Sequence, residues 1–194
     1  MDFYQFARML CRSYLRFVRC WKVEGEKNLP VEGPVIIAAN HVSNLDPVVV
    51  GCAFDRKVSY LAKEELFQVP VLSWIIRHLG AFPVKRGTGD RGAIRAALDV
   101  LEKGDCFGIF PEGTRSKDGN LQQPKLGVAM LAAKTGAPVL PVALINTQRL
   151  LAPITVRVGQ VIKPPWPAGS KVSKEELEAF AQQIMAEIKR LREK

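Results

Sequence analysis

The sequence predicts an α/β fold: a single mixed, mostly parallel central sheet flanked by helices, with an amphipathic helix at the N-terminus. Short apolar runs alternate along the chain with segments of helical periodicity, which is the pattern of parallel sheets. Polar residues follow several of these runs, at the strand ends where α/β sheets bind ligands. With 194 residues, 47% of them hydrophobic, the chain is long enough for one well-packed domain.

Residues 2 to about 23 have the clearest amphipathic pattern, and we divide the chain into this helix (1–24) and a domain (25–194). One sector of the helix is basic, with Arg8, Arg12, Arg16, Arg19 and Lys22. The opposite sector is apolar and rich in aromatics, with Phe3, Phe6, Leu10, Tyr14, Phe17 and Trp21. This composition favours a helix lying in an anionic membrane interface. The alternatives are a helix packed on the domain with its arginines in water and, less favoured, a nucleic-acid-binding helix.

The elements of the domain follow in order. Strands are predicted from apolar runs at 35–39, 58–62, 81–84, 106–110, 139–144 and 154–161. Helices are predicted between them at 48–54, 64–79, 93–103 and 127–135. A final helix opens at the capping box Ser173 to Glu176 and carries an apolar face from Leu177 to Leu191.

Composition limits the classes of function. The net charge of +9 calls for an anionic partner, which is a membrane surface, a phosphorylated substrate or nucleic acid. The four cysteines lack the spacing of a metal site, so we expect neither zinc nor a disulfide framework, but a reducing compartment. No apolar run is long enough for a transmembrane helix, and charges interrupt every apolar stretch near the N-terminus, as no signal peptide would allow.

The stretch from Val35 to Pro47 carries the first candidate site. A buried strand runs into a polar turn that presents His41 and, five residues later, Asp46. Asp46 and Pro47 also have the pattern of a helix N-cap followed by proline. Through such a turn Asp46 can orient His41 as a base. The chain has no Gly-x-Ser-x-Gly elbow, so the pair is suited to activate a substrate hydroxyl. The alternative is a structural histidine capped by a carboxylate.

Two further strand ends carry cations. Lys85 and Arg86 begin a glycine-containing turn before a helix, and Glu112 and Arg115 follow the strand at 106–110. Glycines and a helix N-terminus favour bound anions, and a guanidinium can hold a phosphate with two hydrogen bonds. Both turns are therefore candidate phosphate sites, with solvated surface as the alternative. The loop that follows Ser116 is long, as functional loops often are.

Four blocks of the sequence together resemble the glycerolipid acyltransferases, most closely the bacterial 1-acylglycerol-3-phosphate acyltransferases. They are Asn-His-Val-Ser-Asn-Leu-Asp-Pro (40–47), Gly-Ala-Phe-Pro-Val-Lys-Arg-Gly (80–87), Phe-Pro-Glu-Gly-Thr-Arg-Ser (110–116) and Val-Leu-Pro-Val-Ala (139–143). The first and third blocks are specific, and the other two are loose patterns. The blocks occur in the order of that family.

The resemblance implies roles for individual residues. His41 would be the general base and Asp46 would orient it. The acceptor phosphate would be held by Lys85, Arg86 and Arg115. In the second block Lys85 stands where the family often carries an acid, so Arg115 is the stronger candidate. The site would be supported by Asn40, Glu112, Gly113 and Thr114, and the fourth block would lie near the path of the acyl donor.

The implied activity is transfer of a fatty acyl group to the free 2-hydroxyl of 1-acylglycerol 3-phosphate, giving phosphatidic acid for phospholipid synthesis. No metal or bound cofactor is expected, and acyl-CoA or acyl carrier protein thioester would be the co-substrate. The expected location is peripheral (monotopic), on the cytoplasmic face of the membrane through residues 1–24, with no nucleic-acid partner. Two alternatives remain: a family member acting on glycerol 3-phosphate or another lysolipid, and a non-catalytic anionic-lipid-binding protein.

Overall fold

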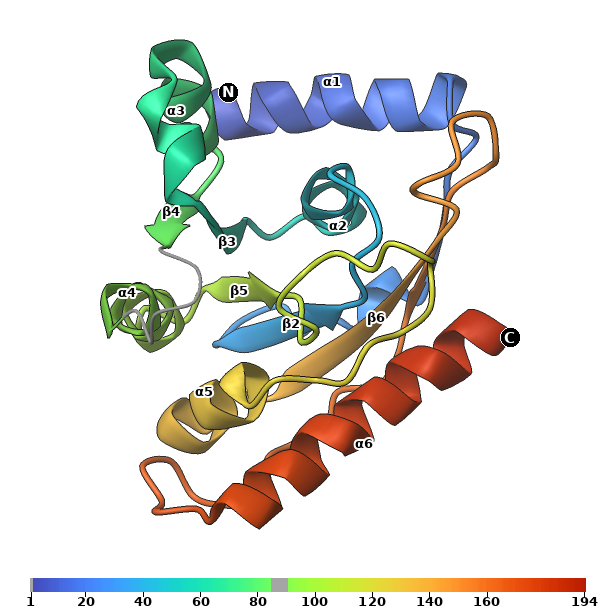
Figure 1. The fold of residues 1–194 in the computed structure, drawn as a ribbon. Coiled ribbons are helices and arrows are strands. Elements are labelled where there is room, and N and C mark those ends of the chain that lie inside the picture. The colour runs from blue at the N-terminus through green and yellow to red at the C-terminus, as the bar shows by residue number, and fades with distance from the viewer. Residues whose placement is uncertain (1, 85–90) are drawn as a thin grey trace.

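A computed structural model describes residues 2–84 and 91–194 of the chain. In this part of the chain one sheet of seven strands has the order β1-β7-β6-β2-β5-β3-β4 (Figure 1). All neighbouring strands are parallel except β6 and β7, which are antiparallel. The strands are β1 (Lys22–Glu24), β2 (Val35–Ala39), β3 (Val58–Lys63), β4 (Ala81–Val84), β5 (Cys106–Ile109), β6 (Val139–Ile145) and β7 (Thr155–Val158). The predicted fold class is confirmed.

Helices cover both faces of the sheet (Figure 1). The helices are α1 (Phe3–Phe17), α2 (Asp46–Ala53), α3 (Pro70–His78), α4 (Arg91–Glu102), α5 (Gly127–Thr135) and α6 (Lys174–Glu193), and two short 3₁₀ turns are η1 (Glu26–Asn28) and η2 (Glu64–Gln68). The first three helices lie on one side of the sheet and the last three on the other. Among the described residues, no helix is both long and apolar enough to cross a bilayer.

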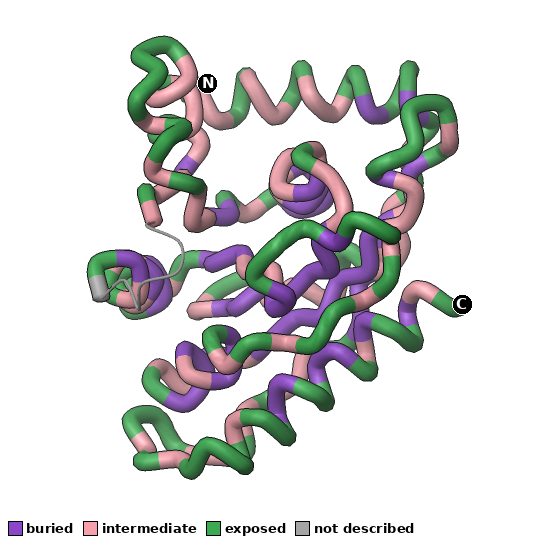
Figure 2. The backbone as a smooth tube through the Cα atoms, viewed as in Figure 1, coloured by how far each residue is buried: buried purple, intermediate pink, exposed green. Residues whose placement is uncertain are grey.

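The central strand β2 supplies side chains to two cores. Every residue of β2 is buried (Figure 2). Successive residues of a strand point to opposite faces of the sheet. Ile37 packs in the core under α1 and α2, and Ile36 packs in the core under α4, α5 and α6. The apolar face predicted for the final helix is confirmed, because Phe180, Ile184 and Ile188 are buried in the second core.

Three predicted elements end elsewhere in the structure. The N-terminal helix stops at Phe17, because Cys20 has a φ of 42° and residues Lys22–Glu24 pair with β7 instead. The helix predicted over 64–79 is broken at Pro70, since the residue before a proline is pushed out of the helical region and Val69 is extended. The last predicted strand, 154–161, covers only Thr155–Val158.

The basic side of α1 faces the domain. The Arg8 and Arg12 guanidinium groups donate hydrogen bonds to carbonyl oxygens at the C-terminal end of α2, at 3.2 Å from Arg8 to Phe54 and 2.8 Å from Arg12 to Cys52. A cation at this end of a helix is favoured by the helix dipole. Arg19 is buried, and Lys22 pairs with Glu24 at 2.8 Å. The prediction that these cations are available to a membrane is therefore wrong for Arg8, Arg12 and Arg19, whereas the side chains of Arg16 and Lys22 are exposed.

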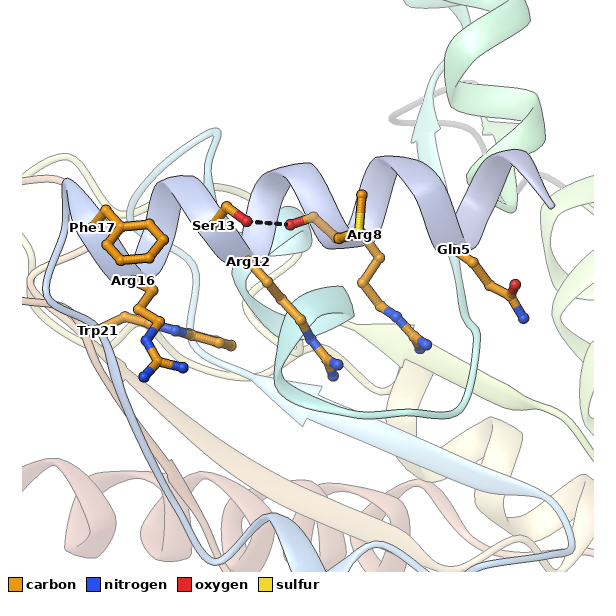
Figure 3. A pocket seen from close by; sticks show the side chains of 8 residues that line it. Gln5, Arg8, Arg12, Ser13, Arg16, Phe17 and Trp21 are labelled. Atoms are coloured by element: carbon orange, nitrogen blue, oxygen red, sulfur yellow. Dashed lines mark hydrogen bonds between the residues drawn. The ribbon is translucent and has the colours of Figure 1, made fainter. Parts of the chain in front are cut away.

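The apolar side of α1 faces away from the domain instead. Its exposed large side chains are Phe6, Met9, Leu10, Tyr14 and Phe17, with Val18 just beyond the helix. A groove of about 530 Å³ with both polar and apolar walls runs beside this face and contains Arg16, which forms no hydrogen bond or ion pair within residues 2–84 and 91–194 (Figure 3). The packing of Arg8 and Arg12 against α2 thus leaves an aromatic stripe in solvent.

Candidate active site

The turn after β2 brings His41 and Asp46 together. His41 Nδ1 lies 2.8 Å from Asp46 Oδ2, and the same oxygen accepts hydrogen bonds from the backbone N–H groups of Val42 and Ser43, both at 2.7 Å. Asp46 is fully buried and His41 is 8% exposed. An ionised carboxylate only accepts hydrogen bonds, so the proton of a neutral His41 belongs on Nδ1. The other nitrogen, Nε2, then carries the lone pair of a base.

Asp46 does not cap α2. The N-cap residue is Leu45, whose own side chain forms no capping hydrogen bond, and the Asp46 carboxylate accepts its hydrogen bonds from the preceding turn. The N-cap predicted at Asp46 is therefore wrong. Its carboxylate points back to the turn, where it binds His41 and two backbone N–H groups in place of the helix end.

Two aromatic rings support the imidazole. Phe110, at the end of β5, stacks on His41 with ring centroids 4.0 Å apart and planes 16° apart. Tyr60 of β3 lies on the other side of Phe110, at 6.2 Å between centroids. Gly108 makes this column possible, since a Cβ there would lie 2.0 Å from the Tyr60 ring. His41 is thus held in its plane by Asp46 and on one face by Phe110.

Glu112 and Asn40 use their side chains to fix the backbone of the site. Glu112 is buried, and its two carboxylate oxygens accept hydrogen bonds from the N–H of His41 at 2.8 Å and of Gln122 at 2.9 Å. The Asn40 amide exchanges two hydrogen bonds with the backbone of Leu144. Both residues therefore position the backbone of the His41 turn.

The neighbouring loop after β5 presents a cation. Gly113, Thr114 and Arg115 are exposed, and the Arg115 side chain forms no hydrogen bond or ion pair with any other described residue. The N–H of Ser116 donates to the His41 carbonyl at 2.8 Å, which fixes this loop against the turn of the base. Arg115 is therefore an unpaired guanidinium on a segment anchored to His41.

Lys125 is a second cation at this strand end, and the sequence reasoning missed it. Its N–H donates to the Pro111 carbonyl at 2.8 Å, and its side chain crosses Gly113 so closely that a Cβ there would lie 2.9 Å from Lys125 Cδ. Gly113 has a φ of 73°, a conformation that favours glycine. Lys125 stands at the end of a long polar loop, and only the return of that loop to Pro111 brings it to the site.

The other predicted phosphate ligands, Lys85 and Arg86, lie outside the described residues. The strand before them, β4, ends at the same edge of the sheet as β2 and β5, because β4, β3, β5 and β2 are mutually parallel. Within residues 2–84 and 91–194, no group of His, Cys, Asp and Glu side chains is suited to hold a metal ion.

An apolar cavity of about 260 Å³ adjoins the turn that carries His41. It lies between α1, α2, β3 and α3, and its wall includes Asn44 from the turn, Gly51 from α2, Tyr60 from β3 and Leu79 beside α3. Since Tyr60 stacks on Phe110, which in turn stacks on His41, the Phe110 ring connects the cavity wall to the imidazole.

The fold and this site define a class of protein. A model of the Acyltransferase family matches residues 20–145, which include β2, the His41 turn and the loop after β5. The chain therefore belongs to the Acyltransferase family.

Individual relatives are more specific. The chain is 37% identical over 128 residues to the 1-acyl-sn-glycerol-3-phosphate acyltransferase of Borreliella burgdorferi, covering 64% of this chain and 51% of that protein. It is 33% identical over 132 residues to the chloroplastic 1-acyl-sn-glycerol-3-phosphate acyltransferase BAT2 of Brassica napus, covering 66% of this chain and 38% of that protein. The chain thus spans less than two thirds of the length of these relatives.

A solved structure is similar over almost the whole chain. The crystal structure of the 1-acyl-sn-glycerophosphate (LPA) acyltransferase PlsC from Thermotoga maritima superposes with a TM-score of 0.72 at 29% identity, over 98% of this chain and 83% of that one. The similarity extends beyond residues 20–145 to both ends of the chain described here.

Proposed function

We propose that this chain transfers a fatty acyl group from a thioester to the 2-hydroxyl of 1-acylglycerol 3-phosphate, giving phosphatidic acid. The observation that carries the proposal is the buried His41–Asp46 pair, which has a free Nε2, beside the unpaired Arg115 at the next strand end. The names of the relatives from Borreliella burgdorferi and Thermotoga maritima support this acceptor.

In the proposed mechanism, Arg115 binds the phosphate of the acceptor together with Lys85 and Arg86. Nε2 of His41 takes the proton of the acceptor hydroxyl while the oxygen attacks the thioester carbonyl. Asp46 stabilises the imidazolium that forms, and general-base help of this kind is worth about 10²- to 10⁴-fold. The tetrahedral intermediate then expels the thiolate, which receives the proton from His41; with a thiol pKa of about 8.5 it leaves without a strong acid.

The transfer is direct, without an acyl-serine on the chain. Ser43 is the hydroxyl nearest to the base in sequence, but its Oγ accepts a hydrogen bond from the N–H of Leu45 at 3.2 Å. Its backbone N–H is held by Asp46 at 2.7 Å. The serine is thus part of the turn that holds the carboxylate, and the acceptor hydroxyl is the nucleophile.

The thioester donor is acyl-CoA or acyl carrier protein, with no bound cofactor. The apolar cavity beside Pro47 and Tyr60 supports this part of the proposal, because it offers an acyl chain a dry path that begins at the turn of the base. We further infer that α1 docks the chain on the cytoplasmic face of the membrane through its exposed apolar side, where the lysolipid acceptor resides.

The experiment is an acyl-transfer assay of the purified chain with lysophosphatidate and either acyl-CoA or acyl carrier protein. We expect phosphatidate from the intact chain and at least a 100-fold lower turnover from His41→Ala. Glycerol 3-phosphate, lysophosphatidylcholine and monoacylglycerol serve as competing acceptors. Vesicle binding without any acyl transfer, unchanged in His41→Ala, would contradict the proposal and indicate a lipid-binding protein.

A further inference from the structure

We propose that the loop between β6 and β7, residues 146–154, inserts Leu150 and Leu151 into the anionic lipid surface on which α1 docks. This inference rests on the proposed membrane docking of α1 and adds a second, separate contact to it. The partner is the surface of an anionic bilayer.

The first observation is the exposure of the two leucines. Leu150 is 78% exposed and Leu151 is 93% exposed, and they are consecutive. Figure 1 shows this loop standing beside the C-terminal end of α1. Single exposed apolar residues are ordinary, but a pair at the tip of a loop beside an apolar helix face indicates an interaction surface.

The second observation is that hydrogen bonds attach the loop to the segment that directly follows α1. The Arg19 guanidinium, just past α1, is buried and donates hydrogen bonds to carbonyl oxygens of Asn146, Arg149 and Ala152. The N–H of Ile154 donates in return to the Arg19 carbonyl at 3.1 Å. A single side chain thus holds three points of the loop, so the position of the leucines relative to α1 is set by the fold.

The third observation is the distribution of exposed apolar side chains around α1. At the end of α1 beside the loop, Phe17 is 78% exposed and Val18 is 63% exposed. At the other end, Trp74 of α3 packs on Phe3 with ring centroids 4.7 Å apart and is itself half exposed. Three segments far apart in the sequence therefore place exposed apolar side chains along α1 and beside both of its ends.

The fourth observation concerns charge and selects the partner. Arg16 directly precedes Phe17 and Val18, and Arg149 directly precedes Leu150 and Leu151. Both arginines are exposed, and neither side chain has a hydrogen bond or ion pair to the rest of the described chain. Each exposed apolar pair thus has an unpaired cation directly before it. This arrangement matches an anionic bilayer, where the apolar groups enter the acyl boundary and the cations contact the headgroups.

The test is flotation with vesicles of phosphatidylcholine and phosphatidylglycerol. We expect the double variant Leu150→Ser, Leu151→Ser to partition onto these vesicles at least about tenfold less than the intact chain, since each leucine contributes buried apolar area. The matched control is Val31→Ser, which removes an apolar side chain of 87% exposure. Val31 precedes β2, whereas the leucine loop follows β6, so Val31 lies at the other end of these two parallel strands. Its replacement should change partitioning less than twofold.

The outcomes separate this inference from the function on which it rests. Equal partitioning of the intact chain and the double leucine variant overturns the role of the loop, even if α1 docks. Absence of vesicle binding by the intact chain overturns membrane docking as a whole. Turnover of lysophosphatidate dispersed in detergent should be the same for the double variant and the intact chain, because the loop carries none of the proposed catalytic groups.

Discussion

At the scale of single residues, Asp46 holds three hydrogen bonds on one carboxylate oxygen. An amide in its place offers either an acceptor or a donor at that position, but not an acceptor with negative charge. We expect Asp46→Asn to lower kcat by about 10²- to 10⁴-fold with little change in KM, because the His41 tautomer is lost while acceptor binding is kept. Steady-state kinetics with lysophosphatidate measure this.

Ser43→Ala is the matched control for Asp46. It removes the Oγ that accepts from Leu45 but leaves the backbone N–H that Asp46 binds. Turnover should stay within a few-fold of the intact chain. A loss as large as that of His41→Ala would instead indicate a serine nucleophile.

Arg115 and Lys125 are expected to bind the acceptor phosphate together. Replacing either with alanine should raise KM for lysophosphatidate about 10- to 100-fold, since a hydrogen bond to a charged group is worth about 1.5–3 kcal/mol. Turnover of monoacylglycerol, which lacks the phosphate, should stay unchanged. Lys117→Ala, an exposed lysine of the same loop, is the control and should leave both KM values as they were.

Cys11 offers a pH-dependent readout of the packing of α1 on α2. A hydrogen bond with the Cys52 thiol lowers the pKa of Cys11 to about 7. Only the thiolate is alkylated, so the rate of iodoacetamide labelling at Cys11 should rise with pH and level off above about 7. Cys52→Ala removes the hydrogen bond, so the pKa of Cys11 should rise and the plateau should move to higher pH. Mass spectrometry of the labelled peptide follows the rate, and an unchanged plateau would contradict the assignment.

At the scale of elements, α1 is attached to the domain by its polar side. Arg12 binds the carbonyls of Cys52 and Phe54 and the carboxylate of Asp55, all at the end of α2. We expect Arg12→Ala to lower the free energy of unfolding by about 1–2 kcal/mol, because the carbonyls at this helix end lose their donor. Urea unfolding measures the change. Arg16→Ala on the same helix should cost less than about 0.5 kcal/mol.

Sequence periodicity predicted α1 well but not which side it buries. A basic stripe and an aromatic stripe were both visible, and ordinary patterning would place the aromatic stripe inward or in lipid and the basic stripe in water. The carbonyls at the end of α2 instead draw Arg8 and Arg12 onto the domain, and a contact between segments some forty residues apart leaves no local signal in the sequence. Pro70 is the opposite case: its effect on Val69 is local and could have been predicted.

At the scale of the whole molecule, the sequence predicts those parts of the site that directly follow a strand. Because β2 and β5 are parallel neighbours, His41 and Arg115 follow strands that end at the same edge. Their common location follows from the α/β pattern alone. The role of Glu112 could not be predicted, since a carboxylate in a motif next to cations suggests a ligand contact, whereas here it binds two backbone N–H groups. Lys125 was also missed, because its position depends on the return of the long polar loop to Pro111.

The column of Tyr60, Phe110 and His41 joins two properties of the protein that are usually engineered separately. Tyr60 forms part of the cavity wall, and the same ring backs the stack on which the imidazole rests. Gly108→Ala would push a Cβ into Tyr60, so we expect the preferred chain length of the acyl donor and kcat to change together. A panel of acyl-CoA donors of increasing length measures both. Selecting a variant for a longer or shorter fatty acid will therefore also select for a different speed.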